Sequence, residues 1–469
     1  MNGCLIKSVG IVLLGILCAG AVSAKTQKPN FVVIFVDDMG YGDIEPFGSK
    51  QNKTPELNRM AEEGMKFTSF YAAAPLCSPS RAALMTGCYP KRVGLDVGSI
   101  HAVLLAKDAH GLNPSEKTIA EVLKDEGYAT ACIGKWHLGD QPEFMPNNQG
   151  FDTYFGIPYS NNIWPFEKHP KGAPAYPPLP LMRNEKIVEI VEDMGDQAQL
   201  CRRFTEEALS FIKENRDQPF FVYLPHTSVH HPRTAPVEFL KRAGKEQNLD
   251  EERMLTDKKY AMNQRLRAQV EELDWSTGQV LDCIRDLGLA DNTLVIFTSD
   301  NGPSAGGSSG PLKGNKGKSF EGGMREPMIA WWPGTIPANT TCDEVATVMD
   351  LLPTFAALSG GAVPRDRIID GKNIMPLLRG DEEATSPYHA FFYHRRDVLE
   401  AVRSGEWKLT VKGELYNLDE DIGERNNVAA QHPEVVERLR GYLAACRADL
   451  NDPDHCRAVG HNSNPQYLE

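Results

Sequence analysis

The chain has 469 residues, of which 41% are hydrophobic and 24% are charged, so it is globular and too long for one ordinary hydrophobic core. Its formal net charge of −13 argues against nucleic acid as a partner and gives no general attraction for anions. A site for an anionic ligand would therefore have to be built locally.

Residues 1–24 have the pattern of a cleavable secretory signal peptide. Lys7 is followed by an apolar run from Val9 to Val22 and by small residues before Lys25. The run is shorter than the roughly 20 residues of a membrane-spanning helix, so we expect no stable membrane insertion, an uncleaved anchor being the alternative. The pattern predicts a secreted or periplasmic protein, and a lysosome-like compartment is also compatible with it.

The first strong strand signal is Asn30–Val36, a near-continuous apolar run that is typical of a strand buried on both faces of a parallel sheet. It ends at Asp37 and Asp38. Adjacent carboxylates repel each other unless a positive charge lies between them, and hard oxygen ligands suit calcium or magnesium better than zinc. The alternative is that one Asp is a helix cap. The next helical pattern along the chain is Thr54–Gly64, which has Thr-Pro at its start.

Cys77 lies where a short predicted strand, Phe67–Ala74, leads into a predicted helix. Pro79 is tolerated in a first helical turn, and Arg81–Met85 are good helix formers. A helix N-terminus favours anions and would lower the pKa of a thiol, so a nucleophile facing an anionic substrate would fit. The alternatives are a buried small hydrophobic residue or half of a disulfide, with Cys88 as a candidate partner.

The spacing from Cys77 to Arg81 is too short for a thiolate phosphatase, in which the Arg comes six positions after the Cys. Ser115–Glu126 is the next predicted helix, with Ser115 and Thr118 as possible caps. A strand-like segment then leads from Gly127 to Lys135 and His137, whose side chains point the same way if the chain stays extended. Isolated residues of these types are more often surface residues than catalytic ones.

Residues 149–181 form a loop rich in proline and aromatic residues, in which regular structure is excluded over most of its length. Aromatic side chains on such a loop suit a sugar ring or an aryl group, and the alternative is a loop packed on the body of the protein. The aromatic and imidazole side chains concerned are Trp164, Phe166, His169 and Tyr176.

Asp196–Glu214 is a predicted amphipathic helix, and Pro219–Leu224 is a second buried strand that leads to His226, His230 and His231. Three close histidines could indicate zinc, but no further Cys/His cluster supplies the remaining ligands.

Tyr260–Leu287 is one long helical pattern, and Thr293–Thr298 is a third buried strand. It ends at Asp300 and Asn301, which offer oxygen to a hard cation. A glycine-rich loop follows at 306–317, and the lysines in and beside it are either solvated or anion-binding: Lys313, Lys316 and Lys318.

The C-terminal part is predicted as a small antiparallel sheet with one helix, Glu434–Arg447, and we place the domain boundary near Pro376–Pro387. The predicted strands are Phe391–Tyr393, Leu399–Ser404, Glu406–Val411 and Glu414–Leu418. Cys446 and Cys456 have loop-closing spacing and are the best candidates for a disulfide.

The polar residues that follow the apolar strands should meet at one place, because ligand groups in an open parallel α/β sheet gather outside the carboxyl ends of its strands. These residues are Asp37, Asp38, Lys135, His137, His230, Asp300 and Asn301. We therefore expect a single site beside the helix that Cys77 begins.

Six segments, in family order, resemble the signatures of S1-type formylglycine-dependent sulfatases of the alkaline phosphatase superfamily, with likeness to the arylsulfatase A and N-acetylgalactosamine-6-sulfatase type. They are Asp37-Asp-Met-Gly-Tyr-Gly-Asp43, Cys77-Ser-Pro-Ser-Arg81 with Leu84-Met-Thr-Gly87, Gly127-Tyr-Ala-Thr-Ala-Cys-Ile-Gly-Lys135-Trp-His137, the His-x-Pro that ends at Pro232, Ser299-Asp-Asn-Gly302, and Gly314-Asn-Lys-Gly-Lys-Ser-Phe-Glu-Gly-Gly-Met-Arg-Glu-Pro327. Gly87-Cys88 departs from the family, in which Arg or Lys usually follows the Thr-Gly.

The resemblance implies an α/β fold: a large, mostly parallel sheet sandwiched by helices, as in alkaline phosphatase, with a small C-terminal α+β domain on an antiparallel sheet. The domains would be residues 25–380 and 381–469, after the signal peptide.

The resemblance also implies a sulfatase that hydrolyses a sulfate ester, either an aryl sulfate or a sulfated saccharide. Cys77 would be oxidised to 3-oxoalanine (formylglycine) by a formylglycine-generating enzyme, and its hydrate would be the nucleophile. One Ca²⁺ ion would be bound by Asp37, Asp38, Cys77, Asp300 and Asn301.

The remaining site residues have roles that the resemblance implies. Arg81 would pair with the hydrate or with the metal carboxylates. Lys135, His230 and Lys316 would stabilise the sulfuryl oxygens, and His230 or Lys316 would protonate the leaving alcohol. His137 would take a proton during sulfate release, and Ser160 would contact sulfate.

Two alternatives stay open at this point. One is a phosphodiesterase or phosphonate hydrolase of the same superfamily. The other is a catalytically inactive relative that binds sulfated glycans.

Overall fold

The computed structural model describes residues 1, 28–96, 103–167, 175–245, 251–466 and 468. Apart from Met1, the predicted signal peptide lies outside the described residues, as does His169. Within these ranges, no helix has the length and hydrophobicity needed to cross a bilayer.

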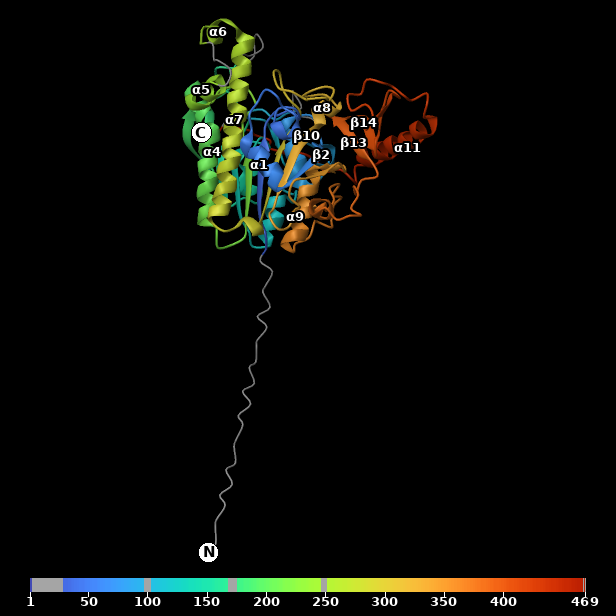
Figure 1. The fold of residues 1–469 in the computed structure, drawn as a ribbon, viewed down its shortest axis with the longest axis horizontal. Helices are drawn as coiled ribbons and strands as arrows, with labels where there is room; N and C mark the ends of the chain where they lie inside the picture. Colours follow the sequence, from blue (N-terminus) through green and yellow to red (C-terminus); the bar gives the residue numbers. More distant parts are fainter. Residues whose placement is uncertain (2–27, 97–102, 168–174, 246–250, 467, 469) are drawn as a thin grey trace.

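An 11-stranded mixed sheet forms the centre of the molecule (Figure 1). Its middle strands run parallel in the order β9-β1-β8-β4-β5, and the strands at both sides include antiparallel pairs. The strands of this sheet are β1 (Asn30–Val36), β2 (Met65–Tyr71), β4 (Ala129–Lys135), β5 (Thr153–Ile157), β6 (Leu179–Arg183), β7 (Lys186–Val191), β8 (Phe220–Pro225), β9 (Thr293–Ser299), β10 (Arg325–Trp331), β11 (Thr340–Cys342) and β12 (Ala346–Thr347).

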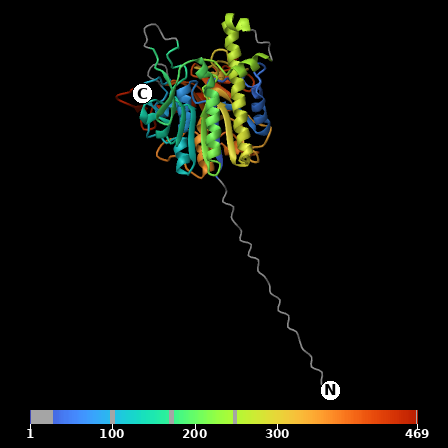
Figure 2. The same cartoon turned by 90° about the vertical axis from the view of Figure 1, so that its left-hand side faces the viewer.

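Helices cover both faces of the sheet, because successive side chains of a strand point to opposite faces. Phe31, Val33 and Phe35 of β1 pack in one cluster with α2, α3 and α9, whereas Val32 and Ile34 pack in another with α1, α4 and α7. Figure 2 faces α4 and α7, with the sheet behind them. The helices are α1 (Pro55–Glu63), α2 (Cys77–Thr86), α3 (Ile119–Asp125), α4 (Met194–Glu214), α5 (Val237–Lys245), α6 (Glu251–Thr256), α7 (Lys258–Asp286), α8 (Glu321–Met324), α9 (Leu351–Ser359), α10 (Met375–Arg379) and α11 (Pro433–Leu450).

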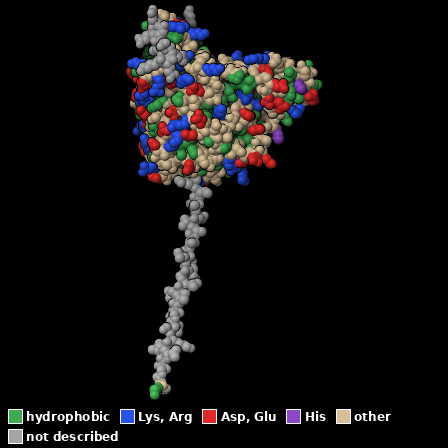
Figure 3. Space-filling view, in the orientation of Figure 1, with side chains coloured by type: hydrophobic (Ala, Val, Ile, Leu, Met, Phe, Trp, Pro, Cys, Tyr) green, Lys and Arg blue, Asp and Glu red, His purple; other side chains and the backbone are tan. Residues whose placement is uncertain are grey.

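A four-stranded antiparallel sheet and α11 form a lobe at the right of Figure 1, with a hydrophobic cluster of their own. Its strands are β13 (Phe391–Arg395), β14 (Val398–Ser404), β15 (Trp407–Thr410) and β16 (Leu415–Asn417). β3 (His110–Gly111) pairs with β17 (Gly460–His461). Acidic side chains gather on the lobe in Figure 3 and mix with basic ones elsewhere on that face. The predicted fold class is confirmed.

The direction of the strands follows from α7. This helix begins beside α6 at the upper end of Figure 1 and runs down the body, and β9 then returns upward. Because β1 and β8 run parallel to β9, their carboxyl ends also face the end at which α6 and the start of α7 project.

Two predicted element boundaries are wrong. The predicted helix 115–126 begins only at Ile119, because Thr118, one of its two predicted possible caps, forms a capping box with Glu121, in which the Glu121 N–H donates to Thr118 Oγ1 over 3.1 Å. The predicted strand 67–74 ends at Tyr71. The chain does not stay extended through His137, which has a φ of +60°.

The predicted disulfide is also absent. All the described cysteines are free, including Cys77 and Cys88. The Cys446 thiol faces His394 Nε2 at 4.0 Å, whereas the Cys456 thiol donates to the carbonyl of Leu450. The two sulfurs are thus held by different neighbours.

Candidate active site

Two carboxylate-bearing strand ends are joined by backbone hydrogen bonds. The N–H of Asp300, after β9, donates to the carbonyl of Val36 over 3.0 Å, and the N–H of Asp38, after β1, donates to Asp300 Oδ1 over 3.1 Å. The N–H of Asp37 donates to Ser228 in the segment after β8 over 2.9 Å. Parallel pairing therefore places the ends of three strands side by side, as the sequence predicts.

Asp37 is fully buried and contacts three of the predicted site residues. Lys135 Nζ lies 2.5 Å and Arg81 Nη2 lies 3.5 Å from its Oδ2, and the Cys77 thiol donates to its Oδ1 over 3.5 Å. Burial alone would raise the pKa of Asp37, but Lys135 and the other nearby cations lower it well below its usual range. Asp37 is therefore an anion in the middle of the site.

Asp38 is the second buried carboxylate. Its Oδ1 lies 2.6 Å from Lys316 Nζ and accepts a hydrogen bond from Asn301 Nδ2 over 2.8 Å. Its Oδ2 lies 3.7 Å from His230 Nε2 and has no hydrogen-bond donor. The glycine-rich loop therefore brings Lys316, and not Lys313, to the site, because Lys313 donates to the carbonyl of Glu424 instead.

Arg81 connects α2 to the carboxylates. Its guanidinium is fully buried, pairs with Asp300 Oδ2 over 2.9 Å and donates to the carbonyl of Lys135 over 2.9 Å. The buried Arg81 guanidinium therefore acts as a structural cation that joins α2 to the carboxyl ends of β4 and β9.

Cys77 is the first residue of α2, as predicted, and is 2% exposed. Lys316 Nζ lies 3.4 Å from its sulfur. Burial and the Asp37 charge raise the pKa of the thiol well above its usual range, so the prediction that the helix N-terminus lowers this pKa is wrong. Desolvation outweighs the helix dipole here, and the thiol is a poor nucleophile as it stands.

The two site histidines have defined tautomers. The carbonyl of Leu104 can only accept, so it receives a proton from His137 Nε2 over 2.9 Å, and His137 Nδ1 keeps a lone pair that is buried and unpartnered. By the same argument His230 Nδ1 donates to the carbonyl of His231 over 2.7 Å, which leaves the lone pair on Nε2, towards Asp38. Burial lowers the pKa of His230 to about 3 and that of His137 well below its usual range.

Ser160 joins the cluster through Lys135, whose Nζ donates to Ser160 Oγ over 2.9 Å. Lys135 therefore bridges Asp37 and a hydroxyl that is itself 3% exposed. Every predicted site residue thus lies in or directly beside one buried cluster.

The donor set fits a hard cation. One ligand atom each from Asp37, Asp38, Cys77 and His230 lies within 4.8 Å of the others. Asp38 Oδ2 and Asn301 Oδ1 are buried acceptors without a donor, which is costly unless a cation lies between them. Sulfur is the soft member of this set, so an oxygen at position 77 would match the other ligands better.

The sequence analysis missed Glu326 in β10. Its side chain is fully buried, and neither carboxylate oxygen has a hydrogen-bond partner. Burial, with the nearby Asp300 and Asp38, raises the pKa of Glu326 well above its usual range, which favours the protonated form of this acid next to the site. Glu326 lies within the Gly314–Pro327 motif, but its own pattern, one Glu at the start of an apolar run, indicates no role for it in the site. His226, in contrast, lies away from the carboxylates and bonds to Ser276 Oγ.

Glu321, directly after the Lys316 loop, anchors that loop to the C-terminal lobe. Its carboxylate accepts from Tyr71 and Tyr393 over 2.6 Å each and lies 3.0 Å from Lys408 Nζ. Lys408 also pairs with Glu424 over 2.9 Å. All of these groups are buried, so the lobe and the loop share one polar network.

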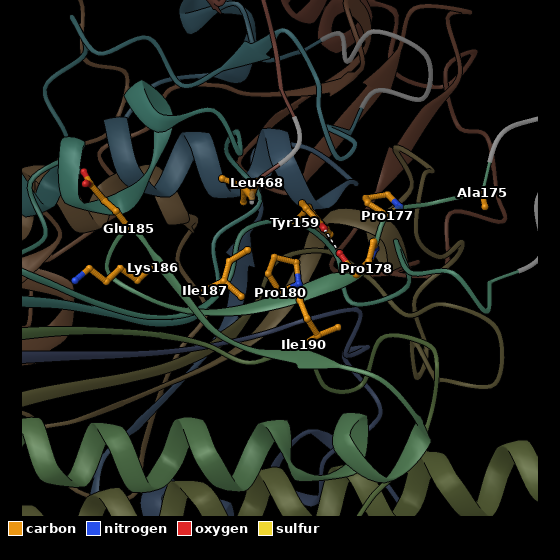
Figure 4. A pocket seen from close by; sticks show the side chains of 10 residues that line it. All are labelled: Tyr159, Ala175, Pro177, Pro178, Pro180, Glu185, Lys186, Ile187, Ile190 and Leu468. Atoms are coloured by element: carbon orange, nitrogen blue, oxygen red, sulfur yellow. Dashed lines mark hydrogen bonds between the residues drawn. The ribbon is translucent and has the colours of Figure 1, made fainter.

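Two surface pockets are lined by residues that follow the strands of the site: Tyr159, after β5, and His231, after β8. One, of about 800 Å³, lies between the proline-rich segment and the β6–β7 hairpin, where the Tyr159 hydroxyl donates to the carbonyl of Pro178 over 2.7 Å (Figure 4). Trp164 is buried and Phe166 is exposed, so the aromatic loop is only partly packed on the body. The other, of about 550 Å³, is lined by His231 and Ser304.

The chain matches the family model "Sulfatase" over residues 29–361 and "N-sulphoglucosamine sulphohydrolase, C-terminal" over residues 315–449. It is 38% identical to N-acetylgalactosamine-6-sulfatase of Canis lupus familiaris over 86% of this chain and 75% of that protein. It is 36% identical to arylsulfatase A of Homo sapiens over 93% of this chain and 91% of that protein. The crystal structure of Ps i-CgsB in complex with k-i-k-neocarrahexaose is similar, with a TM-score of 0.78, 29% identity, and coverage of 93% of this chain and 96% of that chain.

Proposed function

The chain belongs to the sulfatase family and is a sulfuric ester hydrolase, and from that premise we propose that it removes sulfate from a carbohydrate. The observation that carries the proposal is the position of residue 77, at the head of α2 between Asp37 and Lys316. The structural relative with a bound carrahexaose supports a saccharide substrate. Aryl sulfates would serve as model substrates.

We propose that Asp37, Asp38, Asp300, Asn301 and residue 77 hold one Ca²⁺ ion, which neutralises sulfate oxygens when it is bound. The unpartnered oxygens of Asp38 and Asn301 support this ligand set.

Conversion of Cys77 to formylglycine by a formylglycine-generating enzyme would supply a hydrated-aldehyde nucleophile at this position. The high pKa of the thiol supports the proposal, because it makes a thiolate nucleophile unfavourable.

The residues around position 77 would then bind, orient and exchange protons with the ester. Lys135 and Lys316 flank the position and would hold the sulfuryl oxygens, with Ser160 orienting Lys135. Burial alone would lower the pKa of Lys316, but Asp38 raises it well above its usual range, so Lys316 keeps its proton.

Of the two predicted acids, Lys316 carries a proton that it would deliver to the leaving alcohol, whereas His230 Nε2 holds a lone pair and would first have to take up a proton. His137 Nδ1, which has no other partner, would accept a proton from residue 77 when sulfate leaves. Arg81 would keep the carboxylates and residue 77 in place.

Peptide mass spectrometry of protein from its native source, combined with paired assays, tests this function. We expect the peptide that contains residue 77 to carry –CHO in place of –CH₂SH, and hydrolysis of a sulfate ester to exceed that of the matching phosphate ester. Cys77→Ala should abolish turnover, whereas Cys201→Ala, at a buried free cysteine of α4, should retain it.

An intact thiol in active enzyme would refute the nucleophile assignment. Faster phosphate ester hydrolysis would favour the phosphodiesterase alternative. Binding of sulfated glycans without turnover would favour the inactive relative.

We further propose that the protein is exported, with residues 1–24 removed, and that residues 25–380 and 381–469 are its two domains. The separate hydrophobic cluster of the C-terminal lobe supports this division. N-terminal sequencing of the native protein checks the cleavage, and a mature protein that begins at Met1 would contradict it.

A further inference from the structure

A pocket of about 550 Å³ opens directly beside the candidate active site. The ring of His231, which lines it, stacks on the ring of His230 with centroids 4.4 Å apart. Arg233 and Ser304 form the rest of this wall, and Arg233 Nη2 donates to Ser304 Oγ over 3.0 Å. A substrate that extends beyond the site on this side therefore reaches this pocket first.

The opposite wall is one stripe of α7. Lys258, Ala261, Met262 and Arg265 all line the pocket, and their spacing places them on one face of the helix. This part of α7 projects beside α6 above the carboxyl ends of the central strands (Figures 1 and 2). Helix α7 therefore forms a side wall at the entrance to the site.

Lys258 and Arg265 are exposed cations that have no ion pair with any carboxylate of the described residues. None of the described residues that line the pocket is acidic, although the whole chain carries a net charge of −13. With Arg233 on the other wall, the pocket is a local basic region that suits an anion.

Apolar side chains complete the pocket. Met254 and Leu255 of α6 line the pocket together with Met262 of α7, and Leu255 is 89% exposed. A sugar ring presents C–H groups that pack on apolar side chains, and its charged substituents bind cations. A combination of exposed Leu and unpaired cations therefore fits a charged sugar better than a neutral sugar or an apolar aryl group.

Resting on the proposed function, we infer that this pocket binds the sugar next to the one that carries the scissile sulfate. It selects a sugar with an anionic group of its own, either a sulfate or a carboxylate. The preferred substrate is therefore an oligosaccharide with two or more anionic groups, and Lys258 and Arg265 determine that preference.

The test compares kcat/KM for three matched disaccharides that share the scissile sulfate and carry a neutral, a sulfated or a carboxylated neighbouring sugar. A small aryl sulfate serves as the reference substrate. We expect the wild type to favour an anionic neighbour mainly through a lower KM, and the better of the two anionic substrates identifies the group that the pocket binds.

The double variant K258Q/R265Q should reduce the anionic-to-neutral ratio of kcat/KM by about tenfold or more, because a hydrogen bond to a charged group contributes about 1.5–3 kcal/mol. K259Q is the control for one of these two charges: it removes one positive charge from the same helix, next to Lys258 but outside the pocket lining. It should leave the ratio unchanged.

A wild-type enzyme with no preference, or an equal loss in K259Q, would overturn the assignment of the pocket. Turnover of the aryl sulfate without such a preference would overturn the pocket alone and leave the proposed function intact. Failure to hydrolyse any sulfate ester would overturn both.

Discussion

Asp38 and Asn301 each present a buried oxygen that no donor reaches, although both residues make a good hydrogen bond through their other polar atom. Leaving a buried acceptor unpaired costs about 1–3 kcal/mol, so these two oxygens indicate a missing positive partner. The pKa of Asp300 also indicates a missing positive partner, because burial and the charge of Asp37 raise it to about 7. A divalent cation would offset the repulsion among the three carboxylates.

Removal of this cation should destabilise the protein. We expect a calcium chelator to lower the Tm of the wild type, since a ligand at 1,000 times its Kd contributes about 4 kcal/mol of stability. Asn301→Ala should lose most of this chelator-dependent shift, whereas Asn58→Ala, on the surface helix α1, should keep it. Differential scanning calorimetry with and without chelator checks both, and identical wild-type melting curves would refute the cation site.

At the scale of elements, a pair of glycines sets the distance between β4 and β5. Gly134 and Gly156 face each other in the parallel register, and a Cβ on Gly156 would lie 1.8 Å from the carbonyl oxygen of Gly134. Lys135 directly follows Gly134, and Ser160 lies shortly after β5. The close approach of the two strands therefore places Lys135 Nζ against Ser160 Oγ.

Gly156→Ala should destabilise the protein by about 3 kcal/mol, since a clash with backbone cannot be relieved by a rotamer change. Its activity should fall as well, because Lys135 moves. Gly441→Ala is the control: an added Cβ meets nothing within 4 Å on helix α11, so the variant should gain about 0.5–1 kcal/mol. Urea unfolding measures both changes, and equal stabilities would contradict the steric argument.

At the scale of the whole molecule, the polar network around Glu321 connects the C-terminal lobe to the Lys316 loop. Tyr71 comes from the central sheet, whereas Tyr393 and Lys408 come from the small sheet, and all three contact the same carboxylate. Burial alone would raise the pKa of Glu321, but Lys408 and the nearby arginines lower it from 4.5 to about 2. The lobe therefore stabilises the loop that carries a site residue.

Glu321→Gln should destabilise the protein by about 3 kcal/mol near neutral pH, since it leaves Lys408 with an incomplete set of buried partners. The pKa of Glu321 is lower in the folded than in the unfolded protein. Its contribution is therefore complete above about pH 4.5 and is lost as the pH falls towards about 2. The stability difference between wild type and variant should shrink over that range.

Urea unfolding at several pH values checks this dependence. Glu434→Gln, at an exposed position in the first turn of α11, is the matched control and should change little at any pH. A difference between wild type and Glu321→Gln that stays constant with pH would show that the carboxylate charge does not contribute.

The strands that carry the site could be predicted from sequence because a strand that is buried on both faces is a continuous run of apolar residues. β1, β8 and β9 are apolar runs with polar residues at the carboxyl end, and strand order in parallel sheets places such ends together. The motifs then identified Cys77 and the residues around it, and all of these residues lie in or beside one cluster. The helix that Cys77 begins was also predicted from local propensity and the position of Pro79.

Other features depended on residues that are far apart in the chain. The thiol pKa of Cys77 is set by burial against Asp37 and not by its own helix, and the separation of Cys446 from Cys456 follows from how α11 packs against His394. Only the folded structure shows that Glu326 lies behind the site.

By itself, the sequence determined the fold class, the family and which residues are candidates for the site, because hydrophobic periodicity and motif spacing are local properties. Tertiary structure decided which oxygens lack donors, which histidine nitrogen is free, and that one face of α7 lines a basic pocket beside the site. These properties depend on distances and desolvation between distant segments, which no local pattern encodes.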